Sequence, residues 1–195
     1  MTEGVILRGV GGLYYAMDDG ETVHVLRAKG KFRKQGLTPT VGDRILLTPG
    51  QGEEHGWVEA ILPRKNVLIR PPVSNIEHLL LVIAPQPQPD LLLIDTLLVM
   101  ASAQDIRPAL IANKCDLDPA FFEGVRREYG HLGMPLIEAS ARTGAGLEAL
   151  RALLRSGICA FAGQSGVGKS TLLSAATGLT LQTGAISEKI HRGRH

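Results

Sequence analysis

The chain has 195 residues, of which 44% are hydrophobic, and a formal net charge of +2. This length allows one large domain or two small ones, with enough apolar residues for a core. The longest apolar stretches, residues 78–85 and 91–101, are too short or too interrupted to span a bilayer. The N-terminus has no signal-peptide pattern, and the two cysteines form no C-x-x-C pair. We therefore expect a cytoplasmic, reduced protein with no membrane segment and no zinc site in this sequence.

The first third of the chain has the pattern of short β-strands. Apolar runs at residues 4–10, 13–17, 22–27, 43–48 and 56–62 are separated by glycine- and proline-rich turns. Five strands in so few residues predict a small all-β barrel of the OB-fold type over residues 1–66. Residues 67–75, which contain two adjacent prolines, are expected to form a linker.

From residue 76 onward the pattern changes to strands alternating with helices. Buried strands are expected at residues 76–84, 106–112, 135–139 and 158–162, with helices at residues 90–103, 119–129, 147–154 and 170–176 between and after them. Alternating strands and helices predict an α/β domain with a parallel sheet and helices on both faces, over residues 76–195.

A glycine-rich segment lies between the last expected strand and the last expected helix. It fits the phosphate-binding pattern G-x-x-x-x-G-K-[ST] and consists of Gly163, Gln164, Ser165, Gly166, Val167, Gly168, Lys169 and Ser170, followed by Thr171. The glycines let successive N–H groups face one anion, and the helix dipole adds to that field. Lys169 is expected to reach the β- and γ-phosphates, and the Ser170 hydroxyl to ligate Mg²⁺. The alternative is a glycine-rich turn that matches by chance.

A second motif, N-K-x-D, follows the strand expected at residues 106–112. It contains Asn113, Lys114 and Asp116, at a strand end where open parallel sheets bind ligands. The Asp116 carboxylate can accept from guanine N1–H and from the N2 amino group, whereas adenine would leave the carboxylate unpaired. Asn113 would tie the loop to its neighbours, and the Lys114 stem would cover the base. The alternative is a turn in which Asp116 or Asp118 caps a helix.

Ser140 and Ala141 close the next strand. In guanine-nucleotide sites, a Ser-Ala loop presents a backbone N–H to guanine O6. The base-reading motifs therefore precede the phosphate loop, which is the reverse of the usual order in guanine-nucleotide-binding domains. A site at strand ends depends on position in space, so the reversed order is physically reasonable.

A basic run lies in the expected barrel. It contains Arg27, Lys29, Lys31, Arg33 and Lys34 with no acidic residue between them, and it includes Phe32. The cations would suit phosphate contacts to RNA, and Phe32 could stack on a base. The alternative is a solvated basic hairpin face.

Taken together, these motifs resemble those of the circularly permuted GTPases, and closely those of the ribosome small-subunit-dependent GTPase A (RsgA, or YjeQ) family. The resemblance covers the whole chain and extends through Thr183-Gly184, Ser187-Glu188-Lys189 and the segment from Arg192 to His195. It implies an OB-fold that binds ribosomal RNA, and a GTPase that acts late in small-subunit maturation and is stimulated by that subunit. It also implies GTP or GDP and Mg²⁺ as ligands, and we expect a monomer.

The sequence departs from the family pattern after His195. Family members continue with a threonine-rich first switch, a D-x-P-G second switch and a C-terminal zinc-binding domain, and none of these is in the sequence. We therefore expect these 195 residues to bind the nucleotide, and zinc only in the segment that the family adds. The alternative function is an RNA-binding module that holds GTP or GDP without hydrolysing it. A small ATP-dependent kinase is a rival that the two base-reading motifs argue against.

Overall fold

The computed structural model describes residues 1–52, 54–69 and 72–179, which divide into two compact units, Met1–Ile76 and Glu77–His195. The motif residues from Thr183 to His195, and Arg70 and Pro71 of the expected linker, lie outside the described residues. No helix in the described part of the chain is long and apolar enough to cross a membrane.

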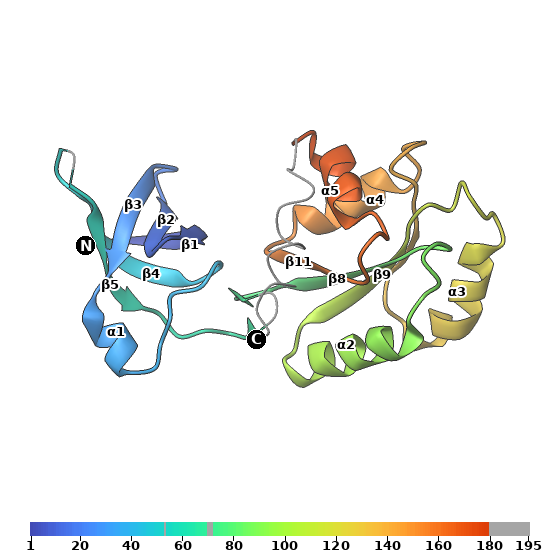
Figure 1. Cartoon of the computed structure of the whole chain (residues 1–195), viewed down its shortest axis with the longest axis horizontal. Coiled ribbons are helices and arrows are strands. Elements are labelled where there is room, and N and C mark those ends of the chain that lie inside the picture. Colours follow the sequence, from blue (N-terminus) through green and yellow to red (C-terminus); the bar gives the residue numbers. More distant parts are fainter. Residues whose placement is uncertain (53, 70–71, 180–195) are drawn as a thin grey trace, which may run out of the picture. The chain divides into compact units, whose positions relative to one another are not determined.

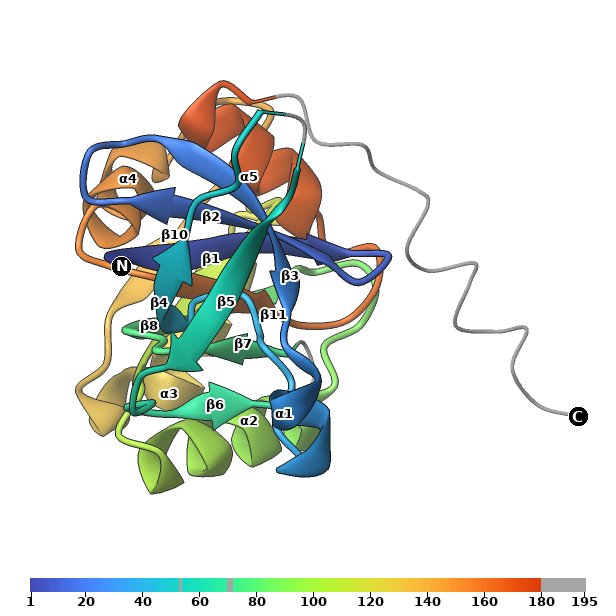
Figure 2. The ribbon, with the colours of Figure 1, turned by 90° about the vertical axis from the view of Figure 1, so that its left-hand side faces the viewer.

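The first unit is a closed barrel of five strands, as the sequence predicts. Its strands are β1 (Thr2–Val10), β2 (Leu13–Asp18), β3 (Val23–Ala28), β4 (Arg44–Thr48) and β5 (Gly56–Ile61), joined in the order β1-β2-β3-β5-β4. Figure 2 shows these strands together with the short helix α1 (Gly30–Lys34) that follows β3. The alternating apolar residues of the strands point inward, and Ile6, Leu26, Ile45, Leu47 and Val58 fill the barrel at 1% exposure or less.

The segment expected to be a linker contains two short strands of its own. Strands β6 (Val67–Leu68) and β7 (Val73–Ser74) pair antiparallel, and the Ser74 N–H donates to the Val41 carbonyl at 2.8 Å. A buried ion pair adds to this attachment, because the fully buried Asp43 accepts from Arg64 Nε at 2.7 Å and from Ser74 Oγ at 2.6 Å. The described residues on both sides of positions 70 and 71 therefore belong to the same compact unit as the barrel.

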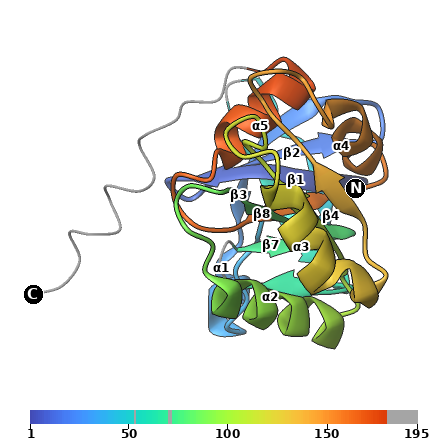
Figure 3. The same cartoon turned by 90° about the vertical axis from the view of Figure 1, so that its right-hand side faces the viewer.

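The second unit contains a parallel sheet of four strands in the order β10-β9-β8-β11. These strands are β8 (His78–Ile83), β9 (Arg107–Ala112), β10 (Leu136–Glu138) and β11 (Cys159–Ala162). Its helices are α2 (Leu91–Ala103), α3 (Phe121–Tyr129), the 3₁₀ turn η1 (Gly130–Leu132), α4 (Leu147–Leu154) and α5 (Lys169–Thr177). Helices α2 and α3 cover one face of the sheet, and α4 and α5 cover the other (Figure 1 and Figure 3). This arrangement confirms the α/β class.

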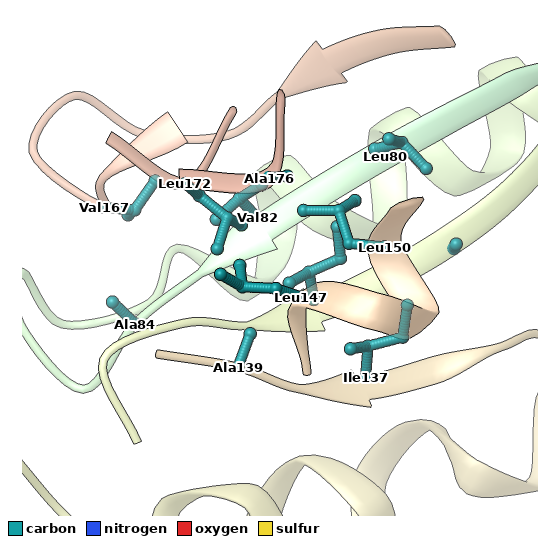
Figure 4. Packing of buried hydrophobic residues seen from close by; sticks show 12 residues of the cluster. Leu80, Val82, Ala84, Ile137, Ala139, Leu147, Leu150, Val167, Leu172 and Ala176 are labelled. Carbon is teal, nitrogen blue, oxygen red and sulfur yellow. The ribbon is translucent and has the colours of Figure 1, made fainter. Parts of the chain in front are cut away.

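The core of the second unit joins the sheet to the loops at its edge. Figure 4 shows side chains of β8, β10, α4 and α5 gathered into one cluster. Val167 belongs to this cluster and is fully buried, although it comes from the glycine-rich loop. Strand β8 is buried along its whole length, as expected for a central strand covered on both faces.

The Asp43 ion pair predicts that substitutions at two neighbouring residues differ greatly in their effect on the free energy of unfolding. Asp43→Ala leaves the Arg64 guanidinium without its carboxylate, and we expect it to lower the free energy of unfolding by about 3 kcal/mol. Arg44→Ala removes only an exposed pair with Glu3, and we expect a loss below about 1 kcal/mol. Urea denaturation followed by fluorescence of Trp57, the single tryptophan and a residue of β5, measures both. Equal losses would contradict this account.

Candidate nucleotide-binding site

Three loops meet where the parallel strands of the second unit end. One follows β9 and contains Asn113, Lys114 and Asp116. One follows β10 and contains Ser140 and Ala141, and one follows β11 and begins at Gly163. Because parallel strands all end at the same edge of the sheet, loops far apart in the chain lie side by side there. The structure thus brings together the three motifs that the sequence predicts.

The glycine-rich loop depends on backbone conformations that L side chains rarely adopt. Gly163, Gly166 and Gly168 have φ values of 136°, 84° and 90°. A Cβ atom at Gly163 would lie 2.2 Å from the Val82 carbonyl oxygen, and one at Gly168 would lie 2.6 Å from Asn113 Nδ2. These positions therefore need glycine both for conformation and for space. Helix α5 begins directly after the loop, so its N-terminal N–H groups face the same region.

The Lys169 ammonium lies against the glycine-rich loop. Its Nζ donates to the carbonyls of Gly163 at 2.9 Å and Gln164 at 2.6 Å. Burial lowers the pKa of Lys169 from its ordinary value, because a desolvated ammonium is less favourable than one in water. Its hydrogen bonds hold the cation over a loop that also presents N–H groups, which is the arrangement a phosphate chain requires. Ser170 and Thr171 follow in the first turn of α5, and both are exposed.

Asn113 links all three loops. Its side chain is 1% exposed, and Nδ2 donates to the Val167 carbonyl at 2.9 Å while Oδ1 accepts from the Ala141 N–H at 3.4 Å. Lys114 has a left-handed φ of 61°, and its Nζ donates to the carbonyls of Gly166 at 2.7 Å and Gln86 at 3.0 Å. The base-reading loop and the phosphate loop are therefore held in a fixed relation by side-chain hydrogen bonds.

The Asp116 carboxylate has partners in the Ser-Ala loop. Ser140 Oγ donates to Oδ1 at 2.5 Å, Arg142 Nε donates to Oδ2 at 2.8 Å, and Arg142 Nη2 forms an ion pair with the same oxygen at 2.7 Å. The Ser140 hydrogen bond and then Arg142 hold the pKa of Asp116 below its ordinary value. A carboxylate that stays ionised is a pure acceptor, suited to a ligand edge that carries only donors.

A cavity of about 240 Å³ lies among these loops. Its walls come from the base-reading loop, the Ser-Ala loop and the start of α5, and consist of Asn113, Lys114, Asp116, Leu117, Ala141, Arg142, Gly168 and Thr171. A base bound there would lie beside the Asp116 carboxylate and near the phosphate loop. Cys115 does not line the cavity, and it is buried with its thiol near the Ala112 carbonyl.

Two features of the site are absent from the sequence predictions. The Gln164 side chain accepts from the Asp90 N–H at 2.9 Å and donates to the Gln88 carbonyl at 3.2 Å, which attaches the segment before α2 to the glycine-rich loop. No spacing in the sequence indicates that contact. Arg142 was also missed, although a cation directly after Ser140 and Ala141 is a signal that could have suggested a partner for Asp116.

The basic run of the barrel is partly as predicted. Arg27, Lys31, Arg33 and Lys34 are exposed, and most of the run forms helix α1. The prediction for Phe32 is wrong, because its ring is 4% exposed and packs in the barrel core, where it cannot stack on a base. The apolar residue of a short amphipathic helix faces the core. Phe32 lies on the buried face of α1. Lys29 forms an ion pair with Glu59, which reduces its availability for phosphate.

Within the described residues, no group of three or more His, Cys, Asp or Glu side chains could hold a metal ion. The Ser170 hydroxyl and the phosphates of a bound nucleotide are oxygen ligands of the kind that Mg²⁺ prefers. Mg²⁺ commonly binds in this way, with few protein ligands and several waters.

Comparison with known proteins identifies relatives for both units. The sequence profile of the RsgA GTPase family matches residues 61–195, and that of the RsgA N-terminal domain matches residues 3–58. A protein of Moorella thermoacetica named "Small ribosomal subunit biogenesis GTPase RsgA" is 42% identical over 99% of this chain and 67% of its own length. A protein of the same name from Ruminiclostridium cellulolyticum is 39% identical over the whole chain and 65% of its own length.

Solved structures give the same result. The crystal structure of YjeQ from Thermotoga maritima matches with a TM-score of 0.81 and 35% identity, over 94% of this chain and 68% of that one. YloQ, described as a circularly permuted GTPase, matches with a TM-score of 0.72 and 30% identity, over 90% of this chain and 64% of its own. The chain spans about two thirds of the length of the curated relatives it matches.

The Asp116 contacts predict a change in one carboxyl pKa. Ser140→Ala removes the strongest partner, so we expect the pKa of Asp116 to rise toward its ordinary value, as measured by carboxyl ¹³C NMR titration. A depressed pKa contributes folding stability at neutral pH that is lost as the pH falls through the folded-state pKa. The Ser140→Ala variant should therefore lose less stability on acidification than the wild-type chain. The pKa of Asp18, which His24 lowers in the barrel, is the internal control. An unchanged Asp116 pKa in the variant would contradict the assignment.

Proposed function

The chain belongs to the RsgA GTPase family, and on this premise we propose that it binds GTP and GDP with Mg²⁺. We further propose that the protein of which these residues form a part hydrolyses GTP during maturation of the small ribosomal subunit. The observation that carries the proposal is the convergence of the glycine-rich loop, the N-K-x-D loop and the Ser-Ala loop on one cavity. Since ribosomal subunits are assembled in the cytoplasm of bacteria, the site of action would be cytoplasmic.

Guanine is the base that the cavity suits best. Guanine N1–H and N2 amino groups are two donors on one edge, and the ionised Asp116 carboxylate supplies only acceptors. The Ala141 N–H, beside Asn113 Oδ1, is a donor suited to guanine O6. Adenine would present an acceptor at N1 and no N2 amino group, so it would make no hydrogen bond to the Asp116 carboxylate and would set a lone pair against it, at a cost of about 1–3 kcal/mol.

The phosphates would extend from the base toward the start of α5. Loop N–H groups and the Lys169 ammonium would bind the β- and γ-phosphates, exchanging the loop carbonyls that Lys169 now contacts for phosphate oxygens. Mg²⁺ bound to those phosphates and to Ser170 would neutralise charge as the terminal phosphoryl group leaves. In hydrolysis, water attacks the γ-phosphorus and the bond to the β-phosphate oxygen breaks, so Lys169 stabilises charge on that bridging oxygen.

The barrel is proposed to bind ribosomal RNA of the small subunit. Arg27, Lys31, Arg33 and Lys34 are exposed on β3 and α1, and basic side chains on one part of a surface suit phosphate contacts. The name of the relatives, which refers to biogenesis of the small ribosomal subunit, supports that partner. We propose that the protein acts as a monomer on the subunit.

The nucleotide proposal predicts a change of base preference in Asp116→Asn. The amide donates where the carboxylate accepts, so it repels the guanine N2 amino group but pairs with the O2 carbonyl of xanthine. We expect GDP affinity to fall by at least about tenfold and xanthosine diphosphate affinity to rise, as measured by calorimetry. Lys169→Ala should weaken both diphosphates equally, because it acts on phosphate. Unchanged GDP affinity in Asp116→Asn would refute guanine recognition by this residue.

The RNA proposal predicts a change in salt dependence. Replacing Lys31, Arg33 and Lys34 with alanine removes up to three phosphate contacts, so the slope of log affinity against log salt should become shallower by about 2 to 3. The matched control removes three exposed arginines of the second unit, Arg126, Arg127 and Arg155. Filter binding of small-subunit RNA at several salt concentrations measures both. A slope that changes equally in the two variants would rule out α1 as the contact.

A further inference from the structure

Arg142 contacts the Asp116 carboxylate with the same kind of donor pair that a guanine base carries. Its Nε donates to Asp116 Oδ2 at 2.8 Å, and its Nη2 lies 2.7 Å from the same oxygen in an ion pair. These two nitrogens and the carbon between them form an N–C–N unit of the guanidinium group. Guanine carries the same unit in N1, C2 and N2, with two N–H donors on one edge. The arginine side chain and the base therefore offer the same donor pair to the same acceptor.

The carboxylate cannot serve both partners fully. Each carboxylate oxygen has two lone-pair positions. Arg142 Nε and Nη2 both lie within 2.8 Å of Oδ2, and Ser140 Oγ fills one of the two positions on Oδ1. The other position on Oδ1 can serve one guanine donor, whereas a second donor needs Oδ2, beside which the guanidinium lies. Guanine can therefore pair both of its donors with the two carboxylate oxygens only if the Arg142 guanidinium moves away from Oδ2.

Arg142 is placed so that it can leave. Its side chain is 72% exposed, whereas that of Asp116 is 10% exposed, and both residues line the cavity. In the part of the chain that the structure describes, the side-chain hydrogen bond and the ion pair of Arg142 both go to Asp116. An exposed arginine that releases a carboxylate regains water, so the exchange has a small cost. Ser140 is 2% exposed and stays in place to orient the carboxylate for its next partner.

We propose that Arg142 is an internal competitor of guanine for Asp116. The Arg142 side chain pairs with this carboxylate when no nucleotide is bound, and the base displaces it on binding. This inference rests on the proposed function and adds a specificity element to the same site. The competitor keeps the carboxylate ionised and oriented, and it lowers the fraction of protein that is ready to accept the base. Because the Arg142 side chain leaves Asp116 before the nucleotide complex is complete, it lowers the association rate constant and leaves the dissociation rate constant unchanged.

The test is stopped-flow binding of fluorescent GDP to the wild-type chain and to Arg142→Ala and Arg142→Lys. The first variant removes the competitor, and the second keeps the positive charge but lacks the planar donor pair. We expect the association rate constant to rise by about 1.5- to 5-fold in Arg142→Ala and in the same direction in Arg142→Lys, with the dissociation rate constant unchanged. Arg155→Ala, which removes another exposed arginine paired with a glutamate, controls for net charge and should show no gain.

Inosine diphosphate makes the test specific. Hypoxanthine has the N1–H donor but no N2 amino group, so it can use the remaining position on Asp116 without displacing Arg142. The gain in Arg142→Ala should therefore be larger for GDP than for inosine diphosphate. Equal gains for both nucleotides, no gain in association, or faster GDP dissociation would overturn the inference, the last because it would mean that Arg142 holds bound nucleotide. If the wild-type chain binds no GDP at all, the proposed function itself fails, which is a separate outcome.

Discussion

The nucleotide site depends on the hydrogen bonds of one buried amide. Asn113 donates to the Val167 carbonyl, 54 residues away in the chain, and accepts from the Ala141 N–H, so three loops are fixed by one side chain. The Asn113 amide is 1% exposed, and both its oxygen and its nitrogen are hydrogen-bonded. Rotating this amide would leave a buried polar group unpaired, at a cost of about 1–3 kcal/mol. The glycine at position 168 leaves room for this contact, since any side chain there would collide with Asn113 Nδ2.

This constraint explains why the order of the motifs along the chain does not matter to the site. Strands β9, β10 and β11 enter the sheet in parallel and end at one edge, and the loops are joined to one another by side chains. Continuous connection through the backbone is not needed. A domain in which the base-reading loop precedes the phosphate loop can therefore form the same site geometry as a domain with the usual order. YloQ, which is described as circularly permuted, has the same fold.

Patterns with a strong local cause were predictable from the sequence. The helix expected at residues 147–154 has the same bounds in the structure, because its apolar residues recur with helical spacing and a glycine precedes it. The barrel and the strand–helix alternation follow equally from periodicity. Roles for residues of the candidate site could be predicted because glycine, lysine and aspartate at fixed spacing serve one kind of chemistry, and these roles stay predictions.

Contacts between distant residues could not be predicted in this way. Phe32 lies in a basic run, and only the packing of α1 on the barrel shows that its ring is buried. Residues 67–75 look like a linker because of their prolines, but the hydrogen bonds of Ser74 to Val41 and Asp43 join part of the segment to residues just before β4, which lie 33 and 31 positions away in the chain. Arg142 belongs to the same class, since its pairing with Asp116 spans 26 residues.

The central claim is that the three joined loops form a site for a guanine nucleotide, and competition between nucleotides tests it most directly. GDP, inosine diphosphate and ADP would each displace a fluorescent guanine nucleotide from the chain in the presence of Mg²⁺. The account predicts that GDP binds at least about thirtyfold more tightly than ADP, with inosine diphosphate between them, because adenine makes no hydrogen bond to the Asp116 carboxylate and sets its amino group against the Ala141 N–H. ADP binding as tightly as GDP would contradict it.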